Sequence, residues 1–512
     1  MRWTPPRNSA RERKVAARLR RASRFYKFLW EIRRELFEDG FEDELLESYE
    51  PRGQDPCPPA LLAMVCLLQR YDGLSDADAV DSAENDRRWQ LVLGTLGRDE
   101  APFGQGTLVR FRTRMITHDL DKKLVDRTVE LAKKTGGFGW KNVRVALDSS
   151  PLHGAGRVED TWNLIGRSMS KVVHAVSLAL GVDENTVVHE AKLTVLSADS
   201  VKAALDVDWD DESAQNEALN RLLKEVSALE AWVAKKTKKA PASPPLTEAL
   251  KLLRTVVEQD TEPDPPKKGA RRIKEGVPPD RVISVSDPQM RHGRKSRTKL
   301  FNGYKRHVAV VERLIVATAV EPANVREHEP AARLLEKVRE HGAIETLDID
   351  RGYLASPAVE ELHRAGATVN SRAWQVSNRG LFTKADFKID LAKGVVRCPG
   401  RKTAPITRSK QVFFREQDCG PCKKKTRCTT APKRSLTLHA AEDLLIKLRR
   451  EKKTPGGRSE LRKRVAVEHR LARVGAIQGT KARYRGARKN ELDLNRTAAV
   501  ANLFEVARRR CA

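Results

Sequence analysis

The pattern of hydrophobic positions over residues 1–135 is helical. Residues 60–68 are apolar throughout, which predicts a buried helix, and Gly73 marks its end. Ser75 can cap the next helix, because an acidic first turn follows it. Short helices joined by glycine-containing turns are typical of a helix-turn-helix DNA-binding domain, but a plain helical bundle would show the same pattern. We therefore predict a helical domain here, with DNA binding and a plain bundle as the two alternatives.

From residue 140 onwards the pattern changes to strands that alternate with helices. Strand-like runs cover residues 143–147, 281–286, 304–311, 314–319 and 343–350. Helical spacing of apolar residues covers 162–180, 330–341 and 359–362. This alternation indicates a mixed α/β sheet, so we predict a core domain over residues 140–375. Within it, residues 200–280 have the composition of an insertion, in which a helical stretch is followed by a proline-rich linker.

The last part of the chain divides into two segments of different composition. Residues 376–440 contain four cysteines among short strands and loops, and residues 441–512 are helical and very basic. Over the whole chain, 97 Lys and Arg residues against 69 Asp and Glu residues give a net charge of +28. A charge of this size attracts phosphate without reading base sequence, and double-stranded DNA is the partner that we expect. A ribosomal or membrane-surface protein could show the same charge balance.

Other bulk features narrow the class of protein. Aromatic residues make up only 5% of the chain, which argues against base stacking as the main way of binding nucleic acid. No apolar run reaches the roughly 18 residues that a spanning helix needs, so we expect no contact with a membrane. An odd number of cysteines and the lack of a secretory signal fit a reducing cytoplasm better than a disulfide framework.

Two aspartates end strand-like runs in the predicted core. Asp148 and Asp350 each close such a run, and Gly352 turns the chain just after the second. Asp148 could simply begin a turn. Asp348 is a rival to Asp350, because residues two apart on a strand point to the same face. Position favours Asp350, since sites in α/β sheets gather at the carboxyl ends of the strands.

Glu468 is the third acidic residue that the pattern singles out. In helical register it falls on one stripe with Leu461, Val465 and Ala472. That stripe is apolar, so we expect the carboxylate to face inward, where it needs a partner. Arg464, one turn back, would be that partner in a purely structural pair, and a bound metal ion is the alternative.

Characteristic short motifs surround two of these acids. One is Asp350-Arg351-Gly352-Tyr353, and the other is Arg464-Val465-Ala466-Val467-Glu468. They resemble the Asp-x-Gly-Tyr and Arg-x-x-x-Glu motifs of the DDE transposases of bacterial insertion sequences. Further passages that resemble this family are Gly73-Leu74-Ser75-Asp76, Arg87-Arg88-Trp89, Arg291-His292-Gly293-Arg294-Lys295, Asn302-Gly303-Tyr304-Lys305-Arg306-His307 and Tyr484-Arg485-Gly486. Their order along the chain and their joint presence make the resemblance specific.

The resemblance implies a catalytic core with an RNase H-like fold, in which Asp148, Asp350 and Glu468 bind two Mg²⁺ or Mn²⁺ ions. Such an enzyme would cut DNA at the ends of the mobile element and join the freed 3′-hydroxyl to target DNA. Arg464 would contact phosphate near the scissile bond or orient Glu468. Because two ends are paired in one complex, the resemblance also implies at least a homodimer on DNA.

The chain departs from the family at two positions. Leu461 and Gly475 stand where the longer family motif has Tyr and Lys, which bears on contacts to DNA and on the activity of this copy. Two other functions therefore stay open. A metal-dependent nuclease without strand transfer would keep the same acids, and an inactive, transposase-derived DNA-binding protein would keep the charge.

A group of basic residues lies before and on one predicted core strand. Its members are Arg291, Arg294, Lys295, Arg297, Lys299, Lys305 and Arg306. Charges of this density are suited to follow a phosphate backbone, so we predict that the group binds DNA. A solvated loop is the alternative.

The four late cysteines are Cys398, Cys419, Cys422 and Cys428. Four thiolates can bind Zn²⁺ tetrahedrally, and a Cys-x2-Cys pair is common in such sites. The long gap after the first cysteine is unusual for one. A structural zinc site and a set of free thiols are therefore both compatible with the sequence.

Overall fold

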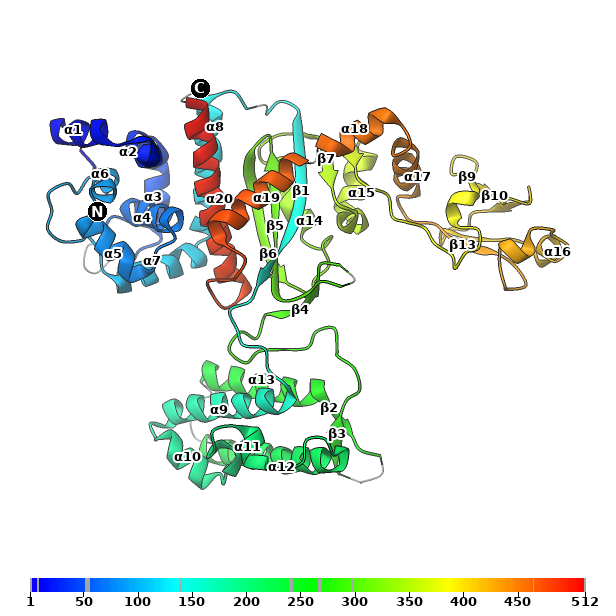
Figure 1. The fold of residues 1–512 in the computed structure, drawn as a ribbon, viewed down its shortest axis with the longest axis horizontal. Coiled ribbons are helices and arrows are strands. Elements are labelled where there is room, and N and C mark those ends of the chain that lie inside the picture. Colours follow the sequence, from blue (N-terminus) through cyan, green and yellow to red (C-terminus); the bar gives the residue numbers. More distant parts are fainter. Residues whose placement is uncertain are drawn as a thin grey trace.

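The computed structural model describes residues 2–6, 9–50, 56–138, 140–238, 243–265, 269–296, 298–463 and 465–510. A central sheet separates the amino-terminal helices from the cysteine-containing segment, and a second helical unit lies beside the sheet (Figure 1). None of the helices in these ranges is long and apolar enough to span a membrane.

The described residues before 136 are helical, as predicted. The helices are α1 (Ala10–Arg18), η1 (Arg21–Ser23), α2 (Arg24–Leu36), α3 (Asp39–Glu47), α4 (Pro59–Asp72), α5 (Asp76–Asn85), α6 (Arg87–Leu93), α7 (Gln105–Thr117) and α8 (Leu120–Thr135). Gly73 ends α4 in the left-handed conformation that favours glycine, with φ at +74°. The Ser75 hydroxyl then accepts the N–H of Asp78 and begins α5.

The central sheet is mixed, as the alternation of strands and helices predicts. Its strands are β1 (Val143–His153), β4 (Arg291–Arg294), β5 (Leu300–Val311), β6 (Leu314–Pro322), β7 (Ile344–Ile349) and β8 (Thr368–Asn370). They pair in the order β4-β5-β1-β7-β8, and β6 also pairs with β5. β1, β7 and β8 are parallel, while β5 runs antiparallel to β1 and β6.

One predicted strand is wrong. Residues 281–286 form no strand. Val282 and Val285 are buried against the second helical unit, whereas Ile283 is buried against the central sheet. Apolar side chains of this segment therefore point alternately to two sides because each side packs against a different core. This pattern arises without pairing to another strand.

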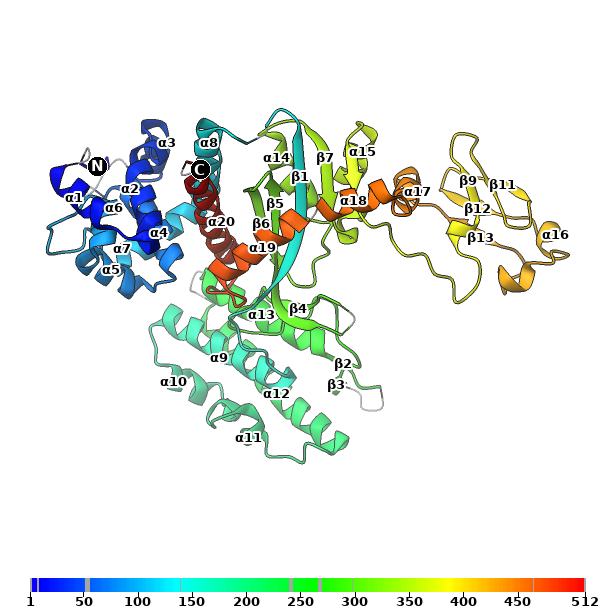
Figure 2. The ribbon, with the colours of Figure 1, turned by 45° about the horizontal axis from the view of Figure 1, so that its top comes forward.

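Helices cover both faces of the sheet. α14 (Ala331–Arg339), η3 (Arg351–Ala355) and α15 (Pro357–Arg364) share a hydrophobic core with one face and with the amino-terminal helices. α19 (Val465–Gln478) packs on the opposite face, and α20 (Ala487–Arg510) lies alongside α8 and β6. α17 (Glu442–Glu451) and α18 (Pro455–Lys463) precede α19 (Figure 2). The helical prediction for the basic carboxyl-terminal segment is thus confirmed.

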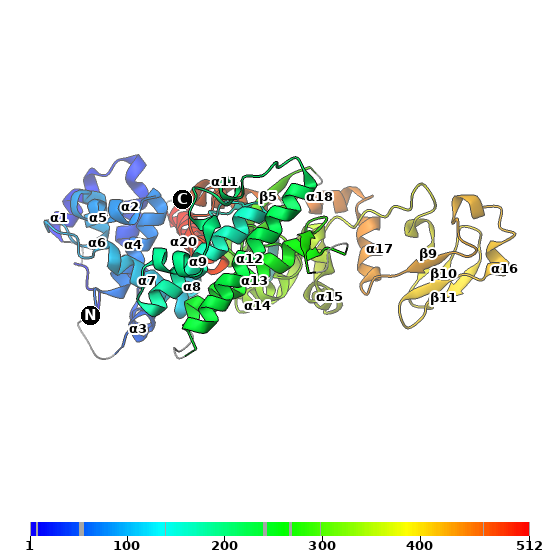
Figure 3. The ribbon, with the colours of Figure 1, turned by 90° about the horizontal axis from the view of Figure 1, so that it is seen from below.

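The predicted insertion of residues 200–280 is part of a larger packed helical unit with its own core, which begins at Thr161 rather than near residue 200. Its elements are α9 (Thr161–Leu180), α10 (Glu184–Glu190), η2 (Thr194–Leu196), α11 (Val201–Leu205), α12 (Glu212–Lys236), α13 (Pro244–Asp260), β2 (Thr261–Pro263) and β3 (Arg271–Ile273). Figure 3 shows α9, α12 and α13 together. The prediction of a proline-rich linker is wrong for α13, because Pro244 and Pro245 occupy the first turn of this helix, where no N–H is required.

The cysteine-containing segment extends away from the sheet (Figure 2). It holds η4 (Lys384–Asp386), β9 (Lys388–Asp390), β10 (Val395–Arg397), β11 (Thr403–Pro405), β12 (Gln411–Phe413), α16 (Glu416–Cys419), η5 (Lys425–Arg427) and β13 (Ser435–Thr437). Its strands are only three residues long, and its core is small. Short strands and loops are what the sequence predicts here.

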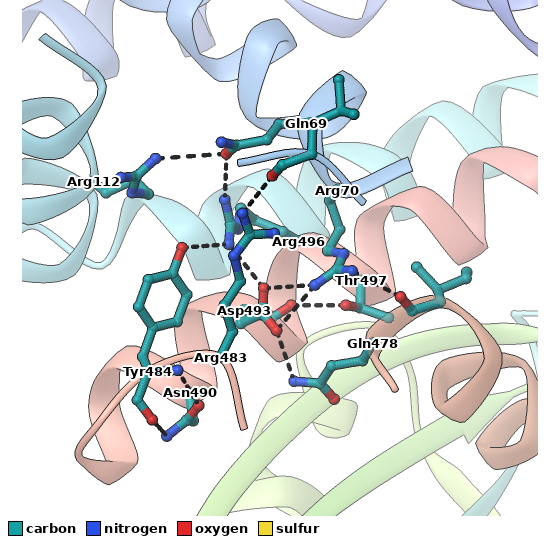
Figure 4. Close-up of polar contacts among 12 residues, drawn as sticks. Gln69, Arg70, Arg112, Gln478, Arg483, Tyr484, Asn490, Asp493, Arg496 and Thr497 are labelled. Atoms are coloured by element: carbon teal, nitrogen blue, oxygen red, sulfur yellow. Dashed lines mark hydrogen bonds and ion pairs between the residues drawn. The ribbon is translucent and has the colours of Figure 1, made fainter. Parts of the chain in front are cut away.

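A buried polar network joins the amino-terminal helices to the end of the chain (Figure 4). The Asp493 carboxylate on α20 accepts hydrogen bonds from Arg70 of α4 at 3.0 Å, from Arg496 at 2.8 Å and from the Gln478 amide at 3.2 Å. Arg70 also donates to the Ile477 carbonyl at the end of α19. Burial alone would raise the pKa of Asp493, but the two guanidinium groups and the amide hold it below its usual value.

We expect Asp493→Ala to lower the free energy of unfolding by about 3–5 kcal/mol, because it leaves two buried guanidinium groups without their anion. Urea unfolding would measure this difference. Asp443→Ala is the matched control: Asp443 pairs with His363 at the surface, and its loss should change stability by less than about 1 kcal/mol.

The stabilisation by Asp493 should also depend on pH. Because the folded-state pKa lies below the unfolded value of about 3.9, the contribution is complete above that pH and is lost as the pH falls through the folded pKa. The gap between wild type and Asp493→Ala should therefore narrow in acid. A gap that is constant down to pH 2 would contradict this assignment.

Candidate active site

Two of the predicted acids come together at one edge of the central sheet. β1 and β7 are parallel neighbours in which Leu147 pairs with Ile349, so Asp148 and Asp350 are the next residues on adjacent strands. Asp148 Oδ1 accepts the Ser149 N–H at 2.8 Å. Asp350 stands just beyond β7, where its Oδ1 accepts the Arg351 N–H at 2.8 Å and caps the short helix η3.

Glu468 reaches this edge from α19, but not from the buried side of the helix. The described buried positions of α19 are Val467, Val474 and Gln478, while Glu468 is exposed. The prediction of an inward-facing, buried Glu468 is therefore wrong. The hydrophobic stripe of α19 is offset by one residue from the predicted one, and Leu461 belongs to the separate helix α18. Arg464, its predicted partner, lies outside the described residues.

The three carboxylates line one open pocket with a volume of about 520 Å³. The other polar side chains that line it are Ser149, Ser150, Arg294, Lys295, Lys305, Arg306 and Glu327. Carboxylate oxygens are the donors that Mg²⁺ and Mn²⁺ prefer, so the chemistry of this donor set fits such ions. Among the described residues no group of three His, Cys, Asp or Glu side chains is arranged to hold a metal ion. The acids thus share a pocket without forming a closed cage.

The sequence analysis overlooked Glu327. It lies in the loop between β6 and α14, where hydrophobic periodicity gives no information. No strand-end signal marks it, because residues 320–326 separate it from the predicted strand 314–319, whereas Asp148 and Asp350 directly close their predicted runs. The Ser149 hydroxyl donates to Glu327 Oε1 at 2.8 Å.

Gly352 and Tyr353, the last two residues of the Asp-x-Gly-Tyr motif, each make contacts next to the acidic residues. A Cβ at residue 352 would collide with the Glu327 carboxylate, so a larger residue there would displace this carboxylate from its place. The Tyr353 hydroxyl is buried 2.7 Å from His307 Nδ1. Burial, together with the charges of Glu327 and Asp148, raises the pKa of Tyr353 well above its usual value. Burial and the charge of Lys305 lower the pKa of His307 to about 3, so this imidazole is neutral at physiological pH.

The basic group divides between exposed and buried positions. Arg294, Lys295 and Lys299 are exposed, and the first two line the pocket. Lys305 Nζ donates to the Val325 carbonyl at 2.7 Å.

Two arginines of the group are held by the protein itself. Arg306 is buried, and its guanidinium donates to Ser150 at 2.8 Å, to Gln478 at 2.8 Å and to the Gly479 carbonyl at 2.9 Å. Arg291 donates to two nearby carbonyls. Arg297 lies outside the described residues. Both described side chains therefore have a structural role that the sequence did not suggest.

Asp348 has a structural role that separates it from Asp350. Its buried carboxylate forms a bidentate ion pair with the Arg144 guanidinium, with N···O distances of 2.6 and 2.9 Å. It also accepts a hydrogen bond from the Asn370 amide at 3.0 Å. Asp348 does not line the pocket, whereas Asp350 does. The structure therefore places Asp350, and not its rival, beside Asp148.

The four late cysteines line a second, small cavity of about 30 Å³. All four are free thiols. Cys398 Sγ accepts the Lys402 N–H at 3.3 Å, and burial raises the pKa of the Cys428 thiol. The thiols are gathered, although they are not placed as ligands of one ion.

Comparisons with known protein families identify the chain. Residues 397–507 match the family model described as "Transposase DDE domain". Residues 17–114 match the family model described as "Transposase domain (DUF772)". The chain is a DDE-type transposase of an insertion element. No curated protein and no solved structure matches it.

The two matches cover different parts of the transposase. The DDE match contains Glu468 and the four cysteines, and it ends in α20. The other match covers most of the amino-terminal helices. Asp148 and Asp350 lie outside both, so their assignment depends on the geometry of the pocket.

Substitution of Asp348 should affect the stability of the transposase, whereas substitution of Asp350 should affect its catalytic activity. We expect Asp348→Asn to lower the free energy of unfolding by about 1–3 kcal/mol, because it weakens a buried charged hydrogen-bond pair. Asp350→Asn should change stability by less than about 0.5 kcal/mol and abolish DNA cleavage. Urea unfolding and a cleavage assay on both variants would measure this, and the reverse pattern would contradict it.

Proposed function

We propose that this transposase binds the ends of its insertion element, cuts the DNA there and joins the freed 3′-hydroxyl to target DNA. In this proposal Asp148, Asp350 and Glu468 are the metal-binding carboxylates. One observation carries it: three acids from distant parts of the sequence line the same pocket. We further propose that the enzyme acts on nucleoid DNA in a bacterial cytoplasm.

We also propose that the central domain is an RNase H-like core. The support is a mixed sheet covered by helices on both faces, in which Asp148 in the middle of β1 lies next to Asp350, the residue that follows the adjacent parallel strand β7. The third acid comes from a helix that packs across the sheet. Such an arrangement lets one sheet edge present carboxylates to a phosphate approaching from solvent.

In this proposal the acidic residues of the pocket bind metal ions and the basic residues bind the DNA backbone. Asp148, Asp350 and Glu468 would hold Mg²⁺ or Mn²⁺, which when bound activates water and offsets charge on the phosphate. Arg294 and Lys295 line the same pocket and are exposed, so they are placed to hold the phosphate backbone beside the acids. We propose that Arg297, Arg291, Lys299, Lys305 and Arg464 belong to the same DNA-binding group.

The family's missing lysine has a partial replacement. Gly475 lines the pocket, and Arg306 Nη2 lies 3.5 Å from the point that a Cβ of residue 475 would occupy. A positive charge is therefore present near this position. This observation favours an active enzyme over an inactive DNA-binding protein. A homodimer on paired ends is part of the proposal, because two element ends must be cut in one complex.

The decisive experiment compares Asp148→Asn with wild type on a labelled element end. We expect the variant to bind the end with unchanged affinity and to lose Mg²⁺-dependent cleavage by at least about a thousandfold, because the donor set loses one charge. Glu345→Gln, an exposed residue of β7 outside the pocket, is the control and should cut normally. Equal cleavage by Asp148→Asn would overturn the assignment.

Strand transfer needs its own measurement. Wild-type protein given pre-cut ends and a supercoiled target should produce joined molecules, whereas a nuclease without transfer activity would leave both substrates separate. End binding without either reaction would favour the DNA-binding alternative.

We also propose that the four cysteines bind one structural Zn²⁺. The surrounding segment has three-residue strands and a core of only a few side chains, so it needs a further link to be stable. The four thiols line the same cavity, and a backbone N–H already supports Cys398. Binding would turn the thiols toward a common centre and release their protons.

Metal analysis of purified protein tests the zinc proposal. We expect about one zinc per chain in wild type and in the control Cys57→Ala, and none in Cys422→Ser. The Cys422→Ser protein should also be cut by protease within the cysteine-containing segment. Wild-type protein that lacks zinc after expression in zinc-supplemented medium would show that the thiols are free.

A further inference from the structure

A fourth carboxylate, Glu327, stands in the same pocket as the three predicted acids. β6 is antiparallel to β5, which is itself antiparallel to β1, so β6 and β1 point the same way. The loop after β6 therefore leaves the sheet at the edge where Asp148 and Asp350 stand. Glu327 reaches the pocket from this loop.

Two neighbours fix the position of the Glu327 side chain. The Ser149 hydroxyl, next to Asp148 in the chain, donates to Glu327 Oε1. On the other side the carboxylate packs over Gly352, two residues after Asp350, where it occupies the space of an absent Cβ. Glu327 is thus held between the residues that follow the two aspartates. A carboxylate with a merely solvated role would not need a glycine beneath it.

The charge of two bound divalent cations exceeds the charge of the three predicted carboxylates, and Glu327 would reduce this difference. Two divalent cations carry four positive charges, whereas three carboxylates supply three negative ones. Glu327 supplies the fourth from the same wall. Lys305, which is half-buried in the same pocket, donates to a backbone carbonyl, and its positive charge acts on Glu327.

We propose that Glu327 is a fourth acidic residue of the divalent-cation site and sets its affinity for the ions. This inference rests on the proposed function, because it assumes that the pocket binds the ions. Ser149 and Gly352 are positioning residues that act through Glu327: the first holds the carboxylate, and the second leaves room for it.

Manganese binding tests the proposal without any catalytic readout. Mn²⁺ titration of the full-length protein, followed by electron paramagnetic resonance, gives the dissociation constant. We expect Glu327→Gln to weaken Mn²⁺ binding about tenfold or more, because it removes the charge but keeps the shape and the acceptor for Ser149. Glu327→Asp keeps the charge and should recover part of the affinity. Glu345→Gln, exposed on β7, is the matched control and should bind as wild type does.

Two further variants separate ion binding from a structural role. Ser149→Ala and Gly352→Ala should each weaken Mn²⁺ binding by disturbing the carboxylate, with melting temperatures reported alongside. A Glu327→Gln protein that melts at a lower temperature but binds Mn²⁺ normally would show that Glu327 is only structural, and would overturn the inference.

Mn²⁺ binding by two variants distinguishes an error in the role of Glu327 from an error in the proposed function. If Asp148→Asn abolishes Mn²⁺ binding and Glu327→Gln does not affect it, the cation site stands and Glu327 is not part of it. If neither variant affects Mn²⁺ binding, the pocket is not the cation site at all.

Discussion

The arrangement of the active site depends on the buried carboxylate of Asp493. It joins α4, α20 and the end of α19, and Gln478 extends the network to Arg306 on β5. Buried charges require nearly complete pairing, so these elements can pack in few other ways. The network thereby fixes the end of the helix that carries Glu468. Residues near both ends of the chain are needed to place one carboxylate over the sheet.

The sheet performs the other half of this positioning. Parallel pairing of β1 and β7 puts Asp148 and Asp350 on adjacent strands, and the parallel direction of β6 brings Glu327 to the same edge. Beneath the pocket, the buried pair of Tyr353 and His307 is neutral, so it supports the acids without competing for cations. Carboxylates that line one pocket repel one another, which an ion and exposed basic residues would offset.

Two insertions interrupt the sequence of the central sheet domain, and each has a hydrophobic core separate from that of the sheet. The helical unit from α9 to β3 has a separate hydrophobic core, and the cysteine-containing segment has another, smaller one. Each core is closed by its own residues, so the chain can leave the sheet and return. The sequence indicated both insertions by composition, but it did not show that α9 and α13 belong to one packed unit, because local periodicity shows which face of a helix is buried and not which helix packs against it.

The sequence by itself determined the elements and most of the chemistry. Periodicity located β5, β6 and β7 and placed Asp350 directly after a strand, because local patterns reflect which side chains a strand buries. The prediction that Asp148 ends its strand is wrong, because β1 continues to His153 through its pairing with β5. Tertiary structure decided what depends on contacts between distant segments. It put Glu468 on the exposed side of α19, engaged Arg306 in the core, paired Asp348 with Arg144 and brought Glu327 into the pocket. A loop residue has no period to read, and the partner in a buried ion pair can stand hundreds of residues away in the sequence.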